Sequence, residues 1–156
     1  MEVRELIELF EGNFKQYNQL LNKLEGNPYL LQSLGSNAEL QEKLSLLTDI
    51  QDEIVDFRLK KIISEEHPYL PRINPEHLKQ YGIHRQQPLQ KIILDFLQQR
   101  RALIKLLHAL PLENWERTGV HEDEGHISFK ELVRRMIEKD RKILEELKQA
   151  LMVQHT

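Results

Sequence analysis

Two charged side chains in this chain stand in the middle of apolar helical stripes. Arg100 lies between Phe96 and Leu103 at helical spacing, and Asp140 lies in a similar apolar setting four residues after Met136. Charged groups are rarely buried in full unless an opposite charge pairs with them. We therefore expect an ion pair between Arg100 and Asp140 inside the protein. The alternative is that each side chain lies at the edge of its stripe and extends its charged end to solvent.

Two further charged residues lie beside an apolar stripe earlier in the chain. Glu53 and Arg58 are close neighbours of Ile54 and Phe57. Either of them could extend the expected ion pair. The candidate buried polar network therefore consists of Glu53, Arg58, Arg100 and Asp140. The sequence pattern does not indicate a catalytic residue.

The seven histidines do not follow the spacing of a helical metal site, in which two ligands lie three or four residues apart on one face. His121 and His126, with the acidic residues 122–124 between them, form the His-carboxylate cluster of the sequence. Their spacing is irregular and they fall in a loop. We expect a solvated loop there, with a divalent metal site at His121 or His126 as the alternative.

Composition excludes several classes of function. The chain has no cysteine, which rules out disulfides, thiolate metal sites and cysteine nucleophiles. A formal net charge of −3 argues against a nucleic-acid-binding protein. No glycine-rich phosphate loop or serine nucleophile elbow is present. Without a signal peptide or a run of about 18 apolar residues, we expect a cytoplasmic protein that does not enter the membrane.

Four segments carry a helical period and must position these residues. The first runs from Leu6 to Leu24 and ends at Gly26, and the second runs from Ser36 to about Ser64. The third begins at Pro88 and stops before Pro111. The fourth follows Ser128, which forms a capping-box pattern with Glu131, as Ser36 does with Glu39. The second segment has an apolar stripe that we expect to be buried: Leu40, Leu44, Leu47, Ile50, Ile54 and Phe57.

The segments between the helices are two linkers, residues 65–87 and 111–127. The first linker contains a short predicted helix from Pro75 to Tyr81, closed by Gly82. Each linker is long enough to cross one end of a bundle, and strands find almost no support in the pattern. Four amphipathic helices bury their stripes against one another. We expect an all-α protein, a four-helix bundle with long cross-over linkers, in which residues 1–156 form a single domain.

The C-terminal half resembles a known family. Residues 111–121 read Pro-Leu-Glu-Asn-Trp-Glu-Arg-Thr-Gly-Val-His, and residues 125–132 read Gly-His-Ile-Ser-Phe-Lys-Glu-Leu. They resemble the Trp-Arg-Gly-His-Glu-Gly stretch ahead of the last helix in the DinB-like superfamily, whose members are four-helix bundles. The segment from Phe96 to Arg100 is similar to the family's Phe-x-x-x-Arg, and residues 49–71 are similar to its Arg-Leu…Glu-Asp-x-Pro-x-Leu-Pro region. The resemblance extends from about Leu44 to Leu147.

This resemblance implies where a metal would lie. Members of the family typically bind a divalent metal through three histidines, one on the second helix and two in a His-Asp-x-x-His motif on the last. The motif falls on residues 139–143, where Lys139 and Ile143 replace the histidines and Asp140 is retained. The second-helix position falls near Leu47. Leucine and isoleucine offer no lone pair, and lysine binds a metal only after losing a proton. We therefore expect no bound metal and no cofactor.

The resemblance also implies a function, and the substituted positions imply that its metal chemistry is lost. Characterised relatives include metal-dependent thiol transferases, in which the ion activates a low-molecular-weight thiol. Without a Lewis acid, no group is evident that would lower the pKa of such a thiol. We expect a DinB-like protein that has lost the family metal site and acts by binding or assembly, as a homodimer. Two alternatives stay open: an enzyme acting on a small-molecule ligand, such as a thiol transferase, and a scaffold unrelated to thiol metabolism.

Overall fold

The computed structural model describes residues 2–29 and 38–155 of the 156-residue chain, and most of them are helical. The long helices are α1 (Val3–Glu25), α3 (Ala38–Asp52), α6 (Leu89–Ala109) and α7 (Phe129–His155). A π-helical segment, η1 (Glu53–Leu59), and α4 (Lys60–Ser64) continue α3. No helix in the described ranges is long and apolar enough to cross a membrane.

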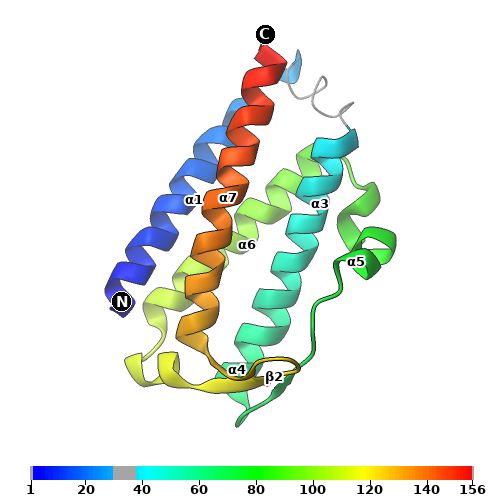
Figure 1. The fold of residues 1–156 in the computed structure, drawn as a ribbon. Coiled ribbons are helices and arrows are strands. Elements are labelled where there is room, and N and C mark those ends of the chain that lie inside the picture. The colour runs from blue at the N-terminus through cyan, green and yellow to red at the C-terminus, as the bar shows by residue number, and fades with distance from the viewer. Residues whose placement is uncertain (1, 30–37, 156) are drawn as a thin grey trace.

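The long helices lie side by side, and the first linker runs along their length (Figure 1). The linker leaves α4 at one end and returns past α3 to the start of α6 at the other end, so α3 and α6 run in the same direction. It carries α5 (Pro75–Tyr81) and the 3-10 helix η2 (Ile83–Gln86), both packed on α3. The expectation that this linker crosses one end was therefore too simple.

The ends of the helices follow from local chemistry and confirm the sequence prediction. Gly26 closes α1 by donating its N–H to Asn22 O at 3.0 Å. Pro88 precedes the first residue of α6, where its missing N–H costs nothing. The short helix α5 has the predicted bounds, because the Asn74 side chain accepts the N–H of His77 at its start. Ser36 lies outside the described residues.

The described part of the chain contains three short strands, for which the sequence pattern gave almost no support. They are β1 (Tyr69–Leu70), β2 (Thr118–His121) and β3 (Gly125–Ser128), with β1 parallel and β3 antiparallel to β2. Gly125 has a φ of 76°, a left-handed conformation that suits glycine at the end of the tight turn. Strands of two to four residues are too short to show a clear alternation of apolar and polar residues.

Buried apolar residues form two clusters. One is centred on Trp115 and Phe129, beside the small sheet, and the other on Tyr17 and Phe96, in the middle of the helices. Both ring pairs meet edge to face, with centroids 5.2 and 4.8 Å apart. Because α1, α6 and α7 all contribute to both clusters, their apolar faces set the spacing of the helices.

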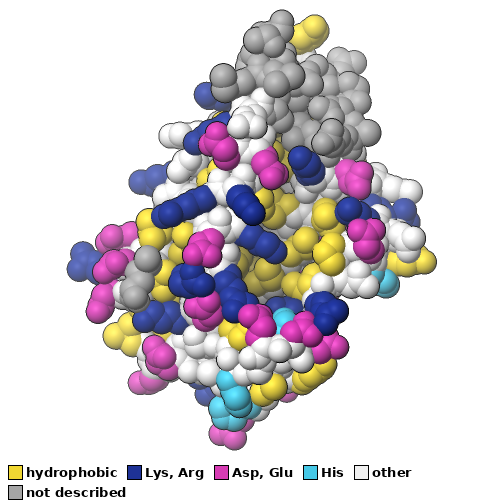
Figure 2. Space-filling model, in the orientation of Figure 1, with side chains coloured by type: hydrophobic (Ala, Val, Ile, Leu, Met, Phe, Trp, Pro, Cys, Tyr) yellow, Lys and Arg dark blue, Asp and Glu magenta, His cyan; other side chains and the backbone are white. Residues whose placement is uncertain are grey.

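The buried face of α3 matches only in part the one that its apolar period predicted. Leu44 is buried in the central cluster as predicted, whereas Leu47 and Ile50 on α3 and Ile54 on η1 are only half-buried. Four polar residues of α3 are buried as well: Ser45, Thr48, Asp49 and Gln51. Figure 2 shows hydrophobic side chains along the middle of this face of the molecule, between α7 and α3, with charged side chains of both signs on either side. The apolar period therefore predicted only part of the buried face of α3, whose polar side faces α6 and the linker.

Candidate functional site

Arg100 on α6 and Asp140 on α7 form a bidentate ion pair inside the protein. Arg100 Nη1 donates to Asp140 Oδ2 at 2.6 Å, and Nη2 donates to Oδ1 at 2.7 Å. The two residues are 2% and 1% exposed, so neither charge reaches solvent. The alternative in which both side chains extend to the surface is wrong. Two parallel charge-assisted hydrogen bonds fix the position of both groups.

The remaining two helices also reach this pair. Tyr17 on α1 donates its hydroxyl to Asp140 Oδ1 at 3.0 Å, and Gln51 Oε1 on α3 accepts from Arg100 Nε. Burial, together with the negative charge of Asp140, raises the pKa of the Tyr17 phenol, which therefore stays protonated and remains a donor. One residue from each long helix thus meets in a single buried network.

The guanidinium of Arg100 lies among aromatic rings from both apolar clusters. Its carbon atom is 4.9 Å from the Phe10 ring centroid, 5.3 Å from that of Phe96 and 5.4 Å from that of Tyr17. Ring faces attract cations, which partly offsets the loss of water around the charge. Arg100 therefore joins the two clusters instead of interrupting them.

Glu53 and Arg58 do not belong to this network. Glu53 is exposed, and Arg58 donates Nη2–H to the Pro71 carbonyl at 2.6 Å, in the linker. Burial lowers the pKa of Arg58, partly offset by nearby Glu53. The helix changes to π hydrogen bonding at Glu53, so positions after it are rotated relative to a 3.6-residue period. Gln51, just before this change, takes the place that the sequence prediction gave to Glu53 or Arg58.

The three positions at which the resemblance would place a metal carry side chains that do not fit one. Leu47 on α3 and Ile143 on α7 are half-buried and pack against the central apolar cluster, and Lys139 is exposed. Two hydrocarbon side chains and an ammonium group offer a cation no ligand. Asp140, the retained member of the motif, is fully occupied by Arg100 and Tyr17.

The hairpin histidines do not come together. His126 pairs with Val120 across β2 and β3, so His121 and His126 lie on opposite faces of the hairpin. His121 Nδ1 accepts the N–H of Asp123 at 3.1 Å, and His126 lies 3.2 Å from the Thr118 hydroxyl. This arrangement accounts for His121 as a local turn acceptor and does not support a shared metal ion.

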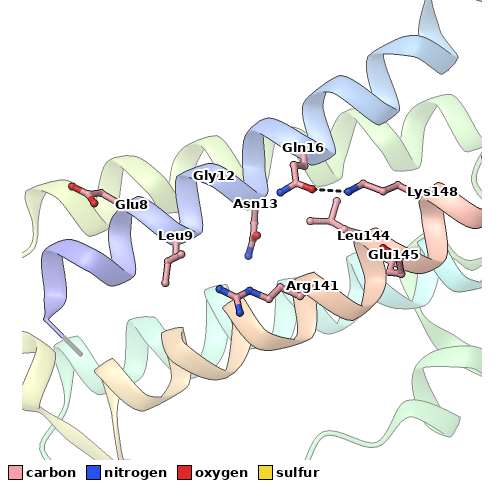
Figure 3. A pocket seen from close by; sticks show the side chains of 9 residues that line it. All are labelled: Glu8, Leu9, Gly12, Asn13, Gln16, Arg141, Leu144, Glu145 and Lys148. Atoms are coloured by element: carbon pink, nitrogen blue, oxygen red, sulfur yellow. Dashed lines mark hydrogen bonds between the residues drawn. The ribbon is translucent and has the colours of Figure 1, made fainter.

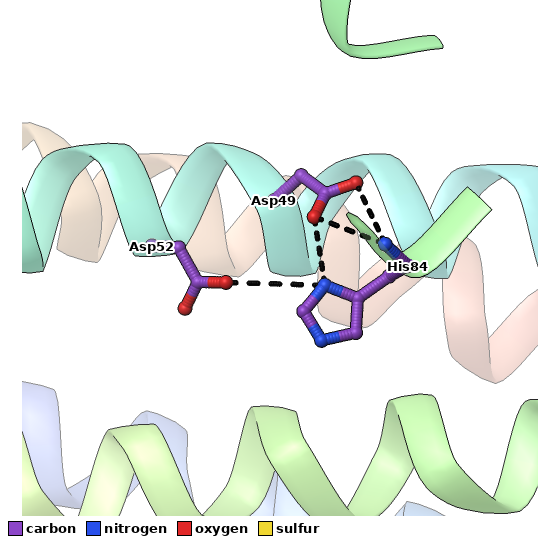
Figure 4. Close-up of side chains that lie close together, drawn as sticks. All are labelled: Asp49, Asp52 and His84. Atoms are coloured by element: carbon purple, nitrogen blue, oxygen red, sulfur yellow. Dashed lines mark hydrogen bonds and ion pairs between the residues drawn. The ribbon is translucent and has the colours of Figure 1, made fainter. Parts of the chain in front are cut away.

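A second polar cluster, which the sequence analysis did not find, lies between α3, η2 and α6. His84 Nδ1 is 2.7 Å from Asp49 Oδ1 and 3.8 Å from Asp52 Oδ2, as Figure 4 shows. His84 Nε2 is 3.0 Å from Asp95 Oδ2 on α6. His84 and Asp49 are 5% and 4% exposed, whereas the side chains of Asp52 and Asp95 reach the surface.

Local structure explains how these residues meet. Asp49 and Asp52 are three residues apart on α3, which places them on one face. A Cβ atom on Gly82 would lie 2.1 Å from Asp49 Oδ2, so only glycine lets the linker approach this carboxylate. The N–H of His84 then donates to Asp49 at 3.3 Å. The i, i+3 aspartates were visible in the sequence, but their partner lies 35 residues away from Asp49.

The charges in the cluster are coupled. Burial alone would lower the pKa of His84, but hydrogen bonds to Asp49 and Asp95 outweigh burial and raise it. Burial likewise opposes the change at Asp95, whose pKa is lowered because Lys91 and His84 bond to its carboxylate. Lys91 Nζ lies 2.9 Å from Asp95 Oδ1. With both ring nitrogens facing carboxylates, His84 is held in one orientation.

Comparisons with known proteins add no identification. No family model, curated protein or solved structure matches this chain. The function must be inferred from the two polar clusters and from the surface.

Proposed function

We propose that this chain is a four-helix bundle of the DinB-like type that acts by binding or assembly, as a homodimer, and not by metal-dependent thiol transfer. The observation that carries the proposal is the closed network of Tyr17, Gln51, Arg100 and Asp140. These side chains are at most 2% exposed and fill the interior between the helices. A substrate thiol could reach none of them without unfolding the helices.

The substituted family positions support the same conclusion. Leu47 and Ile143 add hydrocarbon to the surface between α3 and α7, and Lys139 adds a positive charge beside them. This combination disfavours a cation, so the usual means of activating a thiol is missing at this place. Apolar surface of this kind suits contact with another molecule.

The surface between α1 and α6 supports assembly. A hollow of about 540 Å³ there is lined by Ile7, Leu107 and Trp115, among others. Leu112 borders it and is 71% exposed, and the Trp115 indole N–H is buried with no partner among the described residues. Arg4 and His108 lie around the hollow together with Glu8 and Glu11. Arg4 lies 3.4 Å from Glu8 and His108 lies 2.6 Å from Glu11, so these side chains have partners within one copy. The exposed Leu112 beside the hollow is the apolar side chain that a two-fold contact would cover.

A second hollow, of about 350 Å³, lies between α1 and α7 and differs in character. Figure 3 shows Arg141 and Asn13 extending into the space beside Gly12, with Lys148 bonded to Gln16 at its far side. Its lining is mainly polar and charged. It lacks the exposed large aliphatic side chain that favours the α1–α6 surface for pairing.

Sedimentation velocity of the tag-free protein tests the proposal. We expect a dimer at micromolar concentration that dissociates on dilution. A parallel assay mixes the protein with a low-molecular-weight thiol, an electrophilic acceptor and Zn²⁺ or Mn²⁺, and we expect no transfer above the rate without protein. Metal-dependent turnover that EDTA abolishes would overturn the proposal in favour of a thiol transferase. A strictly monomeric species at all concentrations would contradict assembly.

A further inference from the structure

His84 and its carboxylates have the arrangement of a metal site on the flank of the protein, away from the family position. Among the described residues, Asp49, Asp52 and His84 are the group whose ligand atoms converge: two carboxylate oxygens and Nδ1 all lie within 4.8 Å of one another. Bonds of about 2.0–2.2 Å from an ion to each ligand place such atoms about 3–3.5 Å apart. Small side-chain rotations would bring all three onto one ion.

The outer contacts of His84 match those of a metal ligand. A histidine that binds a metal through one ring nitrogen almost always gives its other N–H to a carboxylate or carbonyl, which sets the tautomer and the ring orientation. Here Nε2 is 3.0 Å from Asp95 Oδ2, and Lys91 holds the other oxygen of Asp95 at 2.9 Å. Nδ1 is thereby left to face Asp49 and Asp52.

Charge balance also favours a cation. Among the described residues, the carboxylates of Asp49, Asp52 and Asp95 lie around His84, and the ammonium group of Lys91 pairs with Asp95. A proton shared with His84 leaves the cluster with one excess negative charge. A divalent ion in place of the Nδ1 proton makes it neutral. Asp49 is buried, and an excess negative charge beside a buried carboxylate lowers the stability of the fold.

The site is open to solvent and contains a hydrogen-bond acceptor without a donor in the described part of the chain, Gln99 Oε1. Asp52, His84, Asp95 and Gln99 line a cavity of about 420 Å³. Gln99 donates its amide N–H to Asp52, while its Oε1 is buried with no hydrogen-bond partner in the described structure. A water bound to an ion at Asp52 would donate to such an oxygen. The cavity therefore offers both an entry path and a place for the ion's water ligands.

We propose that Asp49, Asp52 and His84 bind one divalent transition-metal ion, with Asp95 orienting His84 from behind. One imidazole nitrogen with two carboxylate oxygens suits Zn²⁺ or Mn²⁺ better than Mg²⁺ or Ca²⁺, which prefer oxygen alone. The ligands come from α3 and from η2 of the linker, so the ion fastens the linker to the helices. The proposal goes beyond the proposed function and replaces the sequence-based expectation of no metal.

Calorimetric titration of tag-free, EDTA-treated protein with ZnCl₂ tests the site. We expect one equivalent to bind, and Co²⁺ to give the visible absorption of an ion in a protein site. Asp52→Asn should weaken binding at least about tenfold, as should His84→Gln, and Asp95→Asn about tenfold. Asp52 is the primary variant because its side chain is one-third exposed, which keeps the fold intact. Circular dichroism checks folding in each case.

A matched double variant, His121→Gln with Asp123→Asn, removes the same residue types from the hairpin and should leave binding unchanged. No saturable binding to the wild-type protein would overturn the proposal. Binding that survives in Asp52→Asn and His84→Gln, or that is lost in the hairpin variant, would overturn it too. Because dimerisation is measured separately by sedimentation, failure of the metal site and failure of the proposed function are distinguishable.

Discussion

At the scale of single residues, the chain keeps a charged pair where hydrocarbon would pack as well. A buried ion pair is weak evidence for stability, because desolvation offsets most of the attraction. Its geometry is directional, however, and Arg100 and Asp140 bond only when α6 and α7 are in one register. The hypothesis that follows is that the pair, with Tyr17 and Gln51, specifies how the four long helices align.

The residue-level prediction concerns the cost of removing one charge. Arg100→Ala and Asp140→Ala should each lower the free energy of unfolding by roughly 3–5 kcal/mol, because each strands a buried opposite charge. Replacing both by well-packed apolar residues, Arg100→Met with Asp140→Leu, should cost much less than the sum. Urea unfolding measures all three, with exposed Arg101→Ala as the control. A double variant that loses as much stability as the two single variants together would contradict the network.

The pair itself was predictable from sequence, whereas its partners were not. Arg100 and Asp140 each interrupt an apolar stripe, and opposite charges at such positions have few alternatives to pairing. Gln51 was not assigned, because the apolar period of α3 left it outside the predicted stripe, and Tyr17 has an apolar ring that fits its stripe on α1 without indicating a partner for its hydroxyl. His84 was missed because its chemistry depends on Gly82 and on the path of the linker, which no periodic pattern encodes.

At the scale of elements, the start of α7 shows how local chemistry fixes a boundary. Ser128 Oγ accepts the N–H of Glu131 at 3.0 Å, the first half of the predicted capping box. In a complete capping box the Glu131 carboxylate would also accept the backbone N–H of Ser128. Here the carboxylate accepts hydrogen bonds from Arg134 at 2.6 and 2.8 Å instead. Ser128→Ala should lower the free energy of unfolding by about 1 kcal/mol, measured by urea unfolding. Ser128→Asn, another good cap, should restore most of it.

Glu131 makes the stability of this element depend on pH. Hydrogen bonds from Arg134, followed by those from Arg135, lower the pKa of Glu131 from 4.5 to about 2. Because the pKa is lower in the folded state, ionised Glu131 stabilises the fold. This contribution to the free energy of unfolding is complete above the unfolded pKa of 4.5 and is lost as the pH falls towards 2. Glu131→Gln should remove this dependence, so wild type and variant should converge in stability near pH 2. The difference at pH 7 should stay below about 1 kcal/mol, because the pair is partly exposed.

Helices and strands differ in how far the sequence predicts them. Pro88 and Pro111 flank α6, and Pro75 with Gly82 bounds α5, because these residues restrict the backbone directly. The hairpin of β2 and β3 depends on pairing between two four-residue segments. Four residues are too few to show an alternation of apolar and polar side chains. The π-helical turn at Glu53 gave no signal in the sequence and altered which residues of this helix face inward.

At the scale of the whole molecule, polar and apolar contacts have different roles. The two apolar clusters hold the helices together, the central network sets their register, and the cluster at His84 attaches the linker to the flank. In residues 2–29 and 38–155, two surfaces have an apolar centre: the strip between α3 and α7 (Figure 2) and the hollow between α1 and α6. Side chains of both signs surround the strip, and Lys43 on α3 lies 4.0 Å from Glu146 on α7. The α1–α6 hollow differs from it by the exposed Leu112 at its border.

The last prediction locates the dimer at the α1–α6 hollow. Leu112→Glu places a charge on the exposed aliphatic side chain beside the hollow, and a two-fold interface would bring two such charges together. Dissociation should become at least about tenfold more favourable, since burying an unpaired charge costs well over 1.4 kcal/mol. Tyr81→Glu is the matched control, because Tyr81 is 68% exposed on α5 and lies outside this hollow. Sedimentation equilibrium measures both variants. If Tyr81→Glu abolishes the dimer and Leu112→Glu does not, pairing uses the linker side of the molecule instead.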